Sequence, residues 1–385
     1  MVFDKIVFPF KKIQDENIKY AEKKIGWFCT YTPEEIITAA GFVPFRITGN
    51  KKAKKAEGYF PINFCPYIKS SMEDLLDCRE NLAGVVFTNS CDGMRRFYDT
   101  CAAYIPTVPS FLLDVPRIRN RLSVSHFAAN LEQIVFFLEN IGSKKAEFSD
   151  FEQAIKIHGE KKELLARLYG IFKKQNKKIG AGNYFRILKS AMTAEPVSFS
   201  EALRGYLEEI EPAIQAVIKD ESVKSSQANS PGIMIIGNFI DEERLWDIFD
   251  GLDCFIPVQD VCNSERYFKN VIVSSGTNTG RAKADKNKKS LMGEISTAYL
   301  YKPQCMRMAN LGDKIAEIKD SVEKNNIKGL IFISQKFCDN TLLFYPYLRQ
   351  ELAATGIPSL FLEIEHMNFS AGQIKTRIQA FLEII

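Results

Sequence analysis

One short unit occurs twice in this chain, and the repeat limits the possible folds more than any other feature. The first copy, at 84–113, runs from Gly-Val-Val-Phe through Cys-Asp to Val-Pro-Ser-Phe-Leu-Leu. The second copy, at 329–362, runs from Gly-Leu-Ile-Phe through Cys-Asp to Ile-Pro-Ser-Leu-Phe-Leu. Each copy has the order of a strand, a helix and a second strand, which is the building unit of a parallel sheet. The repeat therefore predicts two similar α/β lobes derived from one ancestral unit.

Short apolar runs and helical patterns alternate on both sides of a long helical segment. Strands are expected at 42–47, 84–88, 108–113, 232–237, 254–258, 329–334 and 359–363. Helices are expected at 32–40, 65–78, 92–104, 241–249, 308–325, 340–355 and 371–384, with Thr32 as the N-cap of the first. Residues 123–225 have the three- and four-residue apolar spacing of helices, and 274–290 is expected to be a polar surface loop.

This pattern predicts the fold class and the domain division. The class is α/β, with two Rossmann-like or flavodoxin-like parallel-sheet lobes and a helical insert. We expect an N-terminal α/β lobe at 1–122, a helical domain at 123–228 and a C-terminal α/β lobe at 229–385.

Composition excludes few classes of protein. The chain has 385 residues, 25% of them charged, and a formal net charge of +4, which indicates neither nucleic acid nor membrane as a partner. Its longest apolar runs have the length of strands and are too short to span a bilayer. Residues 1–12 lack the long apolar core and cleavage site of a signal peptide, so we expect a cytoplasmic protein.

The nine cysteines are the most informative residues of the chain. An odd number of cysteines in a large chain without an export signal argues against a disulfide framework. Three histidines and the absence of any C-x-x-C spacing argue against a zinc ribbon or finger. The choice between incidental buried thiols and metal ligands therefore depends on where the cysteines lie.

Six cysteines are expected in loops or at helix starts, which are Cys29, Cys65, Cys91, Cys262, Cys305 and Cys338. Helix N-termini favour the thiolate, and open α/β sheets bind ligands beyond the carboxyl ends of their strands. Thiolates in a chain with few histidines favour an iron–sulfur cluster over zinc or calcium. Cys78, Cys101 and Cys254 lie inside expected helices or a strand, where packed thiols are the simpler interpretation.

Four motifs carry a resemblance to a known superfamily. They are Gly-Trp-Phe-Cys-Thr-Tyr-Thr-Pro-Glu-Glu at 26–35, Phe-Cys-Pro at 64–66, Cys-Asp-Gly at 91–93 and Lys-Phe-Cys-Asp at 336–339. In this order, over nearly the whole chain, they resemble the 2-hydroxyacyl-CoA dehydratase and benzoyl-CoA reductase superfamily. The chain is most similar to its double-cubane cluster proteins.

The resemblance implies a set of ligands. Dehydratase subunits of the superfamily hold one [4Fe-4S] cluster with three thiolates, which by position are Cys65, Cys91 and Cys338. The double-cubane proteins bind an [8Fe-9S] cluster with six cysteines, which would add three more residues here. Those are Cys29, Cys262 and Cys305, of which Cys305 separates the two branches best.

The resemblance also implies an activity and partners. The expected function is low-potential reduction of small molecules by a homodimer, as in anaerobic metabolism, with electrons from a separate ATP-hydrolysing activator that carries its own [4Fe-4S] cluster. Two alternatives stay open. One is a [4Fe-4S] subunit of a heterodimeric 2-hydroxyacyl-CoA dehydratase, and the other is a non-catalytic electron carrier.

Other features have weaker functional interpretations. The glycine-rich stretch 276–281 lacks the Gly-Lys-Ser/Thr ending of a phosphate-binding P-loop and is expected to be a flexible loop. The lysine-rich stretch 51–55 is either a solvated loop or a docking site for an acidic partner. His366 follows an expected strand, so it is either a structural residue or a proton donor.

Three arginines lie near the candidate ligands in the sequence, which are Arg95, Arg96 and Arg307. Positive charge at these positions would stabilise a reduced, more negative cluster. They are equally compatible with ordinary surface positions.

Overall fold

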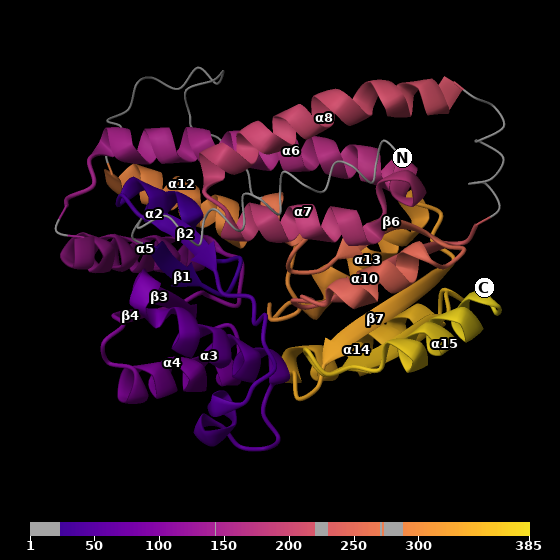
Figure 1. Cartoon of the computed structure of the whole chain (residues 1–385), viewed down its shortest axis with the longest axis horizontal. Helices are drawn as coiled ribbons and strands as arrows, with labels where there is room; N and C mark the ends of the chain where they lie inside the picture. The colour runs from indigo at the N-terminus through magenta and orange to yellow at the C-terminus, as the bar shows by residue number, and fades with distance from the viewer. Residues whose placement is uncertain (1–23, 143, 220–229, 270–271, 273–287) are drawn as a thin grey trace.

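The computed structural model describes residues 24–142, 144–219, 230–269, 272 and 288–385, without the side chains of 215–219. Two α/β lobes lie beside each other, and long helices cover both of them (Figure 1). The glycine-rich stretch and most of the expected loop at 274–290 lie outside the described residues. Among the described residues, no helix is both long and apolar enough to cross a membrane.

The two lobes contain the same four-stranded parallel sheet. The first has the order β2-β1-β3-β4, made by β1 (Lys24–Trp27), β2 (Val43–Arg46), β3 (Leu82–Thr88) and β4 (Ser110–Leu113). The second has the order β6-β5-β7-β8, made by β5 (Gly232–Gly237), β6 (Phe255–Asp260), β7 (Gly329–Gln335) and β8 (Ser359–Ile364). Both sheets follow one topology, which confirms the predicted class and the repeat.

The register of the strands confirms the repeat residue by residue. Val85 pairs with Ser110 in the first sheet, and Leu330 pairs with Ser359 in the second. These pairs occupy equivalent positions in the two sequence copies. In both sheets the strand order has its switch point between the first and third strands, because later strands are added on the other side of the first strand. Open α/β sheets bind ligands at such a switch point.

Helices flank each sheet. The helices that come between the two lobes in the sequence form a separate layer. The first lobe contains α2 (Glu34–Ala39), α3 (Pro66–Cys78) and α4 (Asp92–Tyr104). The layer contains α5 (Arg121–Gly142), α6 (Phe148–Ile179), α7 (Ala181–Thr193) and α8 (Pro196–Lys219). The second lobe contains α10 (Glu243–Asp250), α11 (Glu265–Phe268), α13 (Leu311–Lys324), α14 (Asp339–Ala353) and α15 (Ala371–Leu382). These positions agree with the expected alternation, while the exact domain boundaries stay a prediction.

Several elements were not expected from the sequence, among them β1 and α12. The strand β1 has only four residues, Lys-Ile-Gly-Trp, all of them buried, and such a short run gives no clear period. The helix α12 (Lys288–Leu300) follows the polar segment and packs against α5, so it belongs to the helical layer although it comes from the C-terminal part of the chain.

The predicted N-cap at Thr32 is wrong. Helix α2 begins at Glu34, with Pro33 at the cap position and no side-chain cap hydrogen bond. The hydroxyl of Thr32 is buried without a hydrogen-bond partner. The first two residues of the helix, Glu34 and Glu35, instead form the buried ion pairs described next.

A buried ionic network joins α2 to the helical layer. Glu34 accepts hydrogen bonds from Lys161 at 3.1 Å and from Tyr267 at 2.9 Å. Glu35 pairs with Lys162 at 2.5 Å. Burial alone would raise the pKa of Glu35, but Lys162 and its other partners hold it at about 2. Glu35 is therefore ionised, and each of the two carboxylates contacts a buried lysine amine.

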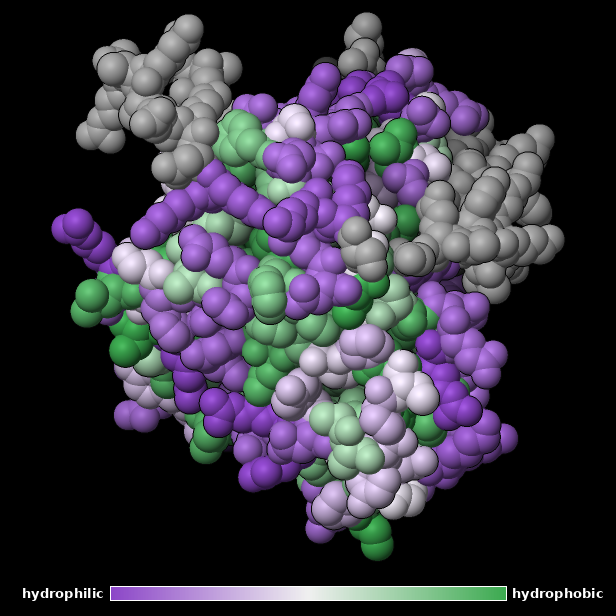
Figure 2. Space-filling model, turned by 90° about the vertical axis from the view of Figure 1, so that its left-hand side faces the viewer, coloured by the Kyte–Doolittle hydropathy of each residue, from purple (hydrophilic) through white to green (hydrophobic). Residues whose placement is uncertain are grey.

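The outer surface mixes apolar and polar residues. Figure 2 shows hydrophobic residues gathered near the centre of one face, with hydrophilic residues around them. On α5, Leu122 and Phe136 are 80% and 62% exposed.

We predict that Lys162→Met destabilises the protein by about 3–5 kcal/mol, because it leaves the Glu35 carboxylate buried without its cation. The exposed pair of Lys324 and Asp320 provides a matched control, and Lys324→Met should cost less than about 1 kcal/mol. Urea unfolding followed by circular dichroism measures both values. Equal free energies of unfolding for the two variants would contradict the role given to the network.

Candidate metal centre

All six candidate cysteines line one cavity between the two lobes. The cavity has a volume of about 100 Å³, and its walls come from residues of both lobes. The cysteines are Cys29, Cys65, Cys91, Cys262, Cys305 and Cys338. Residues that lie far apart in the sequence therefore meet, because both sheets present the carboxyl ends of their strands to this space.

Three of the cysteines lie at helix N-termini. Cys65, Cys91 and Cys338 occupy the N-cap positions of α3, α4 and α14. The backbone N–H of Met94 donates to the Cys91 sulfur at 3.4 Å, and the Asn238 amide donates to the Cys338 sulfur at 2.9 Å. The positive end of each helix and these neutral donors favour negative charge on sulfur. We call these three residues the helix-cap triad.

The other three cysteines lie in loops. Cys29 follows β1, Cys262 follows β6, and Cys305 lies between α12 and α13. The Cys262 thiol donates a hydrogen bond to Cys305, which raises the pKa of Cys262 and lowers that of Cys305. We call these residues the loop triad.

Electrostatic interactions couple the thiols both within the triads and between them, since Cys91 also responds to Cys29 and Cys338 to Cys305. Burial raises the pKa of Cys65, and the nearby Cys338 and Cys91 raise it further. Cys262 instead responds to Cys305 and Cys29, both members of the loop triad. Without metal, most of these thiols are therefore protonated, and metal binding would release their protons.

The chemistry of the cavity wall suits an iron–sulfur cluster. Among the described residues that line it there is no carboxylate and no histidine, while three arginines are present. Soft thiolates surrounded by positive charge match an anionic iron–sulfur group. Across the described residues, no three histidine, cysteine or acidic side chains lie close enough to hold a single metal ion. The six sulfurs are spread around a cavity rather than gathered at one point.

Buried cations contact the loop triad. One guanidinium nitrogen of Arg266 lies 3.9 Å from the Cys262 sulfur, and Arg266 also pairs with Asp260 at 2.6 Å. Arg307 donates to the backbone carbonyls of Val115 and Pro116 at 2.7 and 3.0 Å.

A buried lysine adds a further charge on the same side. Lys302 donates to the carbonyl of Thr30, next to Cys29. Burial lowers the pKa of Lys302, and despite the opposing effect of Cys29, Cys262 and Cys305 the pKa stays at about 7. An anionic group bound by the loop triad would therefore favour the charged amine.

These contacts also connect the lobes around the cavity. Lys302 and Arg307 belong to the C-terminal part of the chain, yet their hydrogen bonds go to the N-terminal lobe. Elsewhere around the cavity, the amide of Asn340 donates to the Ser90 carbonyl at 3.0 Å. Polar contacts near both triads thus connect the two lobes at this cavity.

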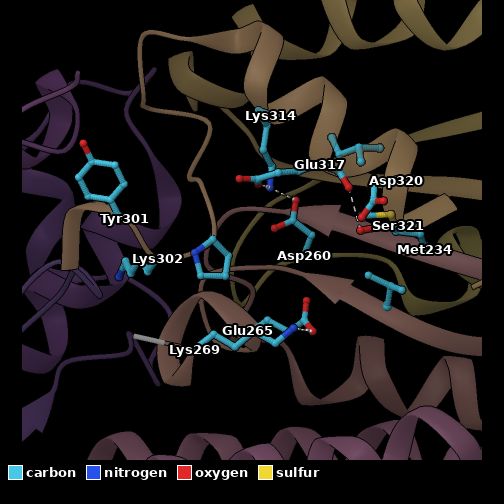
Figure 3. Close-up of a pocket in the computed structure, with 13 residues that line it drawn as sticks. Met234, Asp260, Glu265, Lys269, Tyr301, Lys302, Lys314, Glu317, Asp320 and Ser321 are labelled. Carbon is cyan, nitrogen blue, oxygen red and sulfur yellow. Dashed lines mark hydrogen bonds and ion pairs between the residues drawn. The ribbon is translucent and has the colours of Figure 1, made fainter. Parts of the chain in front are cut away.

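A second cavity lies behind the loop triad. Figure 3 shows Asp260 facing Lys314, and Lys302 and Lys269 are also among the residues that line the cavity. Asp260 pairs with Lys314 at 2.7 Å and, on its other oxygen, with Arg266. This carboxylate therefore separates the charged second cavity from the cysteine cavity.

The structure separates the three arginines and the histidine named from the sequence. Arg307 lines the cysteine cavity, but Arg95 and Arg96 are exposed on α4, where Arg96 pairs with acidic neighbours of its own helix. His366 is buried, its Nε2 lies 2.6 Å from the Gly49 carbonyl, and it does not line the cavity. Burial lowers the pKa of His366, which favours a neutral, structural side chain.

The remaining candidates have ordinary positions. In the lysine-rich stretch 51–55, Lys51 and Lys55 are exposed and pair with Asp77. Cys101 and Cys254 are buried thiols outside the cavity, as expected for core residues, and Cys78 is half-buried at the end of α3.

Sequence reasoning missed several residues of the site, which are Arg46, Asn238, Arg266 and Lys302. Arg266 and Lys302 lie four and three residues from candidate cysteines, so proximity in the sequence offered a weak signal. Arg46 and Asn238 end up beside the cavity only because β2 and β5 end there. No local pattern indicates that placement.

Comparison with known proteins gives the family. The profile described as 2-hydroxyglutaryl-CoA dehydratase, D-component, matches residues 29–385. The chain is 26% identical to the (R)-phenyllactyl-CoA dehydratase beta subunit of Clostridium sporogenes, over 99% of each chain. It is 22% identical to a benzoyl-CoA reductase subunit of Thauera aromatica, over 95% of this chain and 91% of that one. It is 24% identical to the beta subunit of lactoyl-CoA dehydratase of Anaerotignum propionicum, over 98% and 96%.

These relatives are subunits of dehydratases and of a reductase, and the matches cover nearly the whole chain. They confirm the resemblance that the four cysteine motifs indicate. The chain belongs to the 2-hydroxyglutaryl-CoA dehydratase D-component family, within the superfamily of 2-hydroxyacyl-CoA dehydratases and benzoyl-CoA reductases.

Proposed function

We propose that this protein is an iron–sulfur reductase that binds an [8Fe-9S] double-cubane cluster with six cysteines. One observation carries the proposal: six thiols from two lobes line a single cavity whose described wall has no carboxylate or histidine. A site for one cubane needs only three thiolates, so the three cysteines of the loop triad would have no metal to bind. Core thiols would not be expected to converge on a cavity lined by buried arginines.

Both triads would bind such a group. The helix-cap triad would bind one half and the loop triad the other. When bound, the cluster supplies low-potential electrons for substrate reduction. The protein supplies thiolate ligands, buried positive charge and exclusion of water, the last through apolar neighbours such as Phe28, Met94 and Phe239.

Partners follow from the family rather than from the cavity. We propose that a separate ATP-hydrolysing activator with its own [4Fe-4S] cluster reduces this protein in the cytoplasm. The names of the relatives describe subunits, which supports an assembly of more than one chain. We propose a homodimer, since six cysteines in one chain would make the cluster site complete without a second kind of subunit.

A second candidate function is a [4Fe-4S] subunit of a 2-hydroxyacyl-CoA dehydratase. The observation that favours it is the similarity to two relatives named as dehydratases of phenyllactyl-CoA and lactoyl-CoA. In that case the helix-cap triad alone would bind metal, and a second, different subunit would be required.

We predict that the anaerobically reconstituted protein binds about eight irons per chain, as expected for two linked cubanes. Cys305→Ser should lose a large part of this iron and its sulfide, because serine is a harder, poorly matched donor. The buried core residue Cys254 provides a matched control. Cys254→Ser should cost only about 1–3 kcal/mol of stability and leave the iron content unchanged.

Iron and inorganic sulfide analysis of the three proteins tests this assignment. Four irons in the wild type would support the dehydratase alternative. Normal iron in Cys305→Ser would exclude that residue from the ligand set.

We further predict that the protein, with activator and ATP, reduces acetylene to ethylene by two electrons and two protons. Omission of ATP should abolish the reaction, because the activator could not deliver electrons at sufficiently low potential. Gas chromatography of ethylene provides the measurement. Conversion of a 2-hydroxyacyl-CoA to its enoyl-CoA, without acetylene reduction, would favour the dehydratase, and a reducible cluster that turns over neither substrate would indicate an electron carrier.

A further inference from the structure

We propose that the two triads are electrostatically unequal, and that the buried cations Arg266, Lys302 and Arg307 make the loop-triad half of the cluster the first to be reduced. This inference rests on the proposed function, because it requires a cluster bound by both triads. It adds an assignment of which half holds the electron and which residues determine that choice.

Although the buried Arg46 lines the cavity and lies against Tyr67 of α3, the donors that contact the helix-cap triad are neutral. Its three cysteines cap α3, α4 and α14, and its identified side-chain donor, Asn238, is uncharged. A helix N-terminus contributes only a partial positive charge, which falls off within one turn. Added negative charge is therefore stabilised only modestly on this side.

The loop triad is surrounded by two buried guanidinium groups and by the buried Lys302 amine, whose charged form a bound anionic cluster would favour. Arg266 and Arg307 are each 1% exposed, and Lys302 is 3% exposed. The guanidinium of Arg266 lies 3.9 Å from the Cys262 sulfur, Arg307 follows Cys305 by two residues, and Lys302 contacts the residue after Cys29. Each cysteine of the loop triad thus has a buried cation close to it.

These charges are poorly cancelled by the protein. Lys302 and Arg307 donate to backbone carbonyls, and neither has a carboxylate within ion-pair distance in the part of the chain that the structure describes. Arg266 pairs with Asp260, but the same carboxylate also pairs with Lys314, as Figure 3 shows for the second pair. One buried carboxylate is therefore opposed by several buried cations.

The imbalance has a direct redox consequence. Reduction adds one electron from an external one-electron donor, which is itself oxidised, and no bond in the protein forms or breaks. Full charges at low dielectric stabilise the added negative charge more than partial dipoles do. Arg266, Lys302 and Arg307 therefore favour the electron on the side of the loop triad.

The test is a potentiometric titration of the anaerobic, fully loaded protein with dithionite, followed by EPR, together with iron analysis. Lys302→Met should move the first reduction step to lower potential, because it removes a buried positive charge and keeps a side chain of similar length. Lys69→Met is the matched control, since Lys69 is also buried and lies four residues after Cys65, but its charge is paired with Glu57 at 2.7 Å. This control should leave the first step in place.

A second variant separates charge from structural damage. Asp260→Asn removes the carboxylate that faces Arg266 and Lys314, so it should move the first step to higher potential, opposite to Lys302→Met. A general loosening of the site would move both variants in the same direction. Each variant also has its own predicted direction of shift relative to Lys69→Met. The inference therefore stays testable if one of the two variants fails to fold.

The outcomes separate this inference from the proposed function. A wild type without iron, or with a single four-iron cluster, overturns the proposed function and the inference with it. A fully loaded wild type in which Lys302→Met and Asp260→Asn shift the first step no more than Lys69→Met, or shift it in the same direction, overturns the inference alone.

Discussion

Two parallel sheets present the carboxyl ends of their strands to the same space, and the rest of the structure depends on this geometric constraint. Each sheet alone brings only some of the thiols to its edge. The duplicated unit places Cys91 and Cys338 at equivalent positions. Because the two lobes face each other, both cysteines line one cavity. The other cysteines extend this pair on either side. The site therefore requires both lobes, held in a fixed relation.

The buried polar groups maintain that relation. Glu34 in the N-terminal lobe, Lys161 in the helical layer and Tyr267 in the C-terminal lobe meet in one hydrogen-bonded group. Closer to the cavity, Lys302 and Arg307 reach from one lobe to carbonyls of the other. The same cations that join the lobes also supply positive charge to the site, so architecture and electrostatics are not independent here.

The repeat and the cysteine positions were predictable because both rest on local pattern. Strands β3 and β7 are mostly apolar, and the cysteines that follow them stand beside helix starts. The start of α2 was not predictable from Thr32, since the first residues of the helix, Glu34 and Glu35, pair with lysines of the distant α6. Nor were Arg46 and Asn238, whose roles arise only when strands end at a shared cavity. His366 followed the expected pattern of a strand-end residue but turned inward, where the Gly49 carbonyl holds it.

Iron-edge anomalous diffraction from anaerobically grown crystals can decide whether the two triads bind the two halves of one cluster. We expect two groups of anomalous scatterers in the cavity, one bonded to Cys65, Cys91 and Cys338 and the other to Cys29, Cys262 and Cys305. A single group bonded to the helix-cap triad alone, with free thiols at the loop triad, would contradict this assignment.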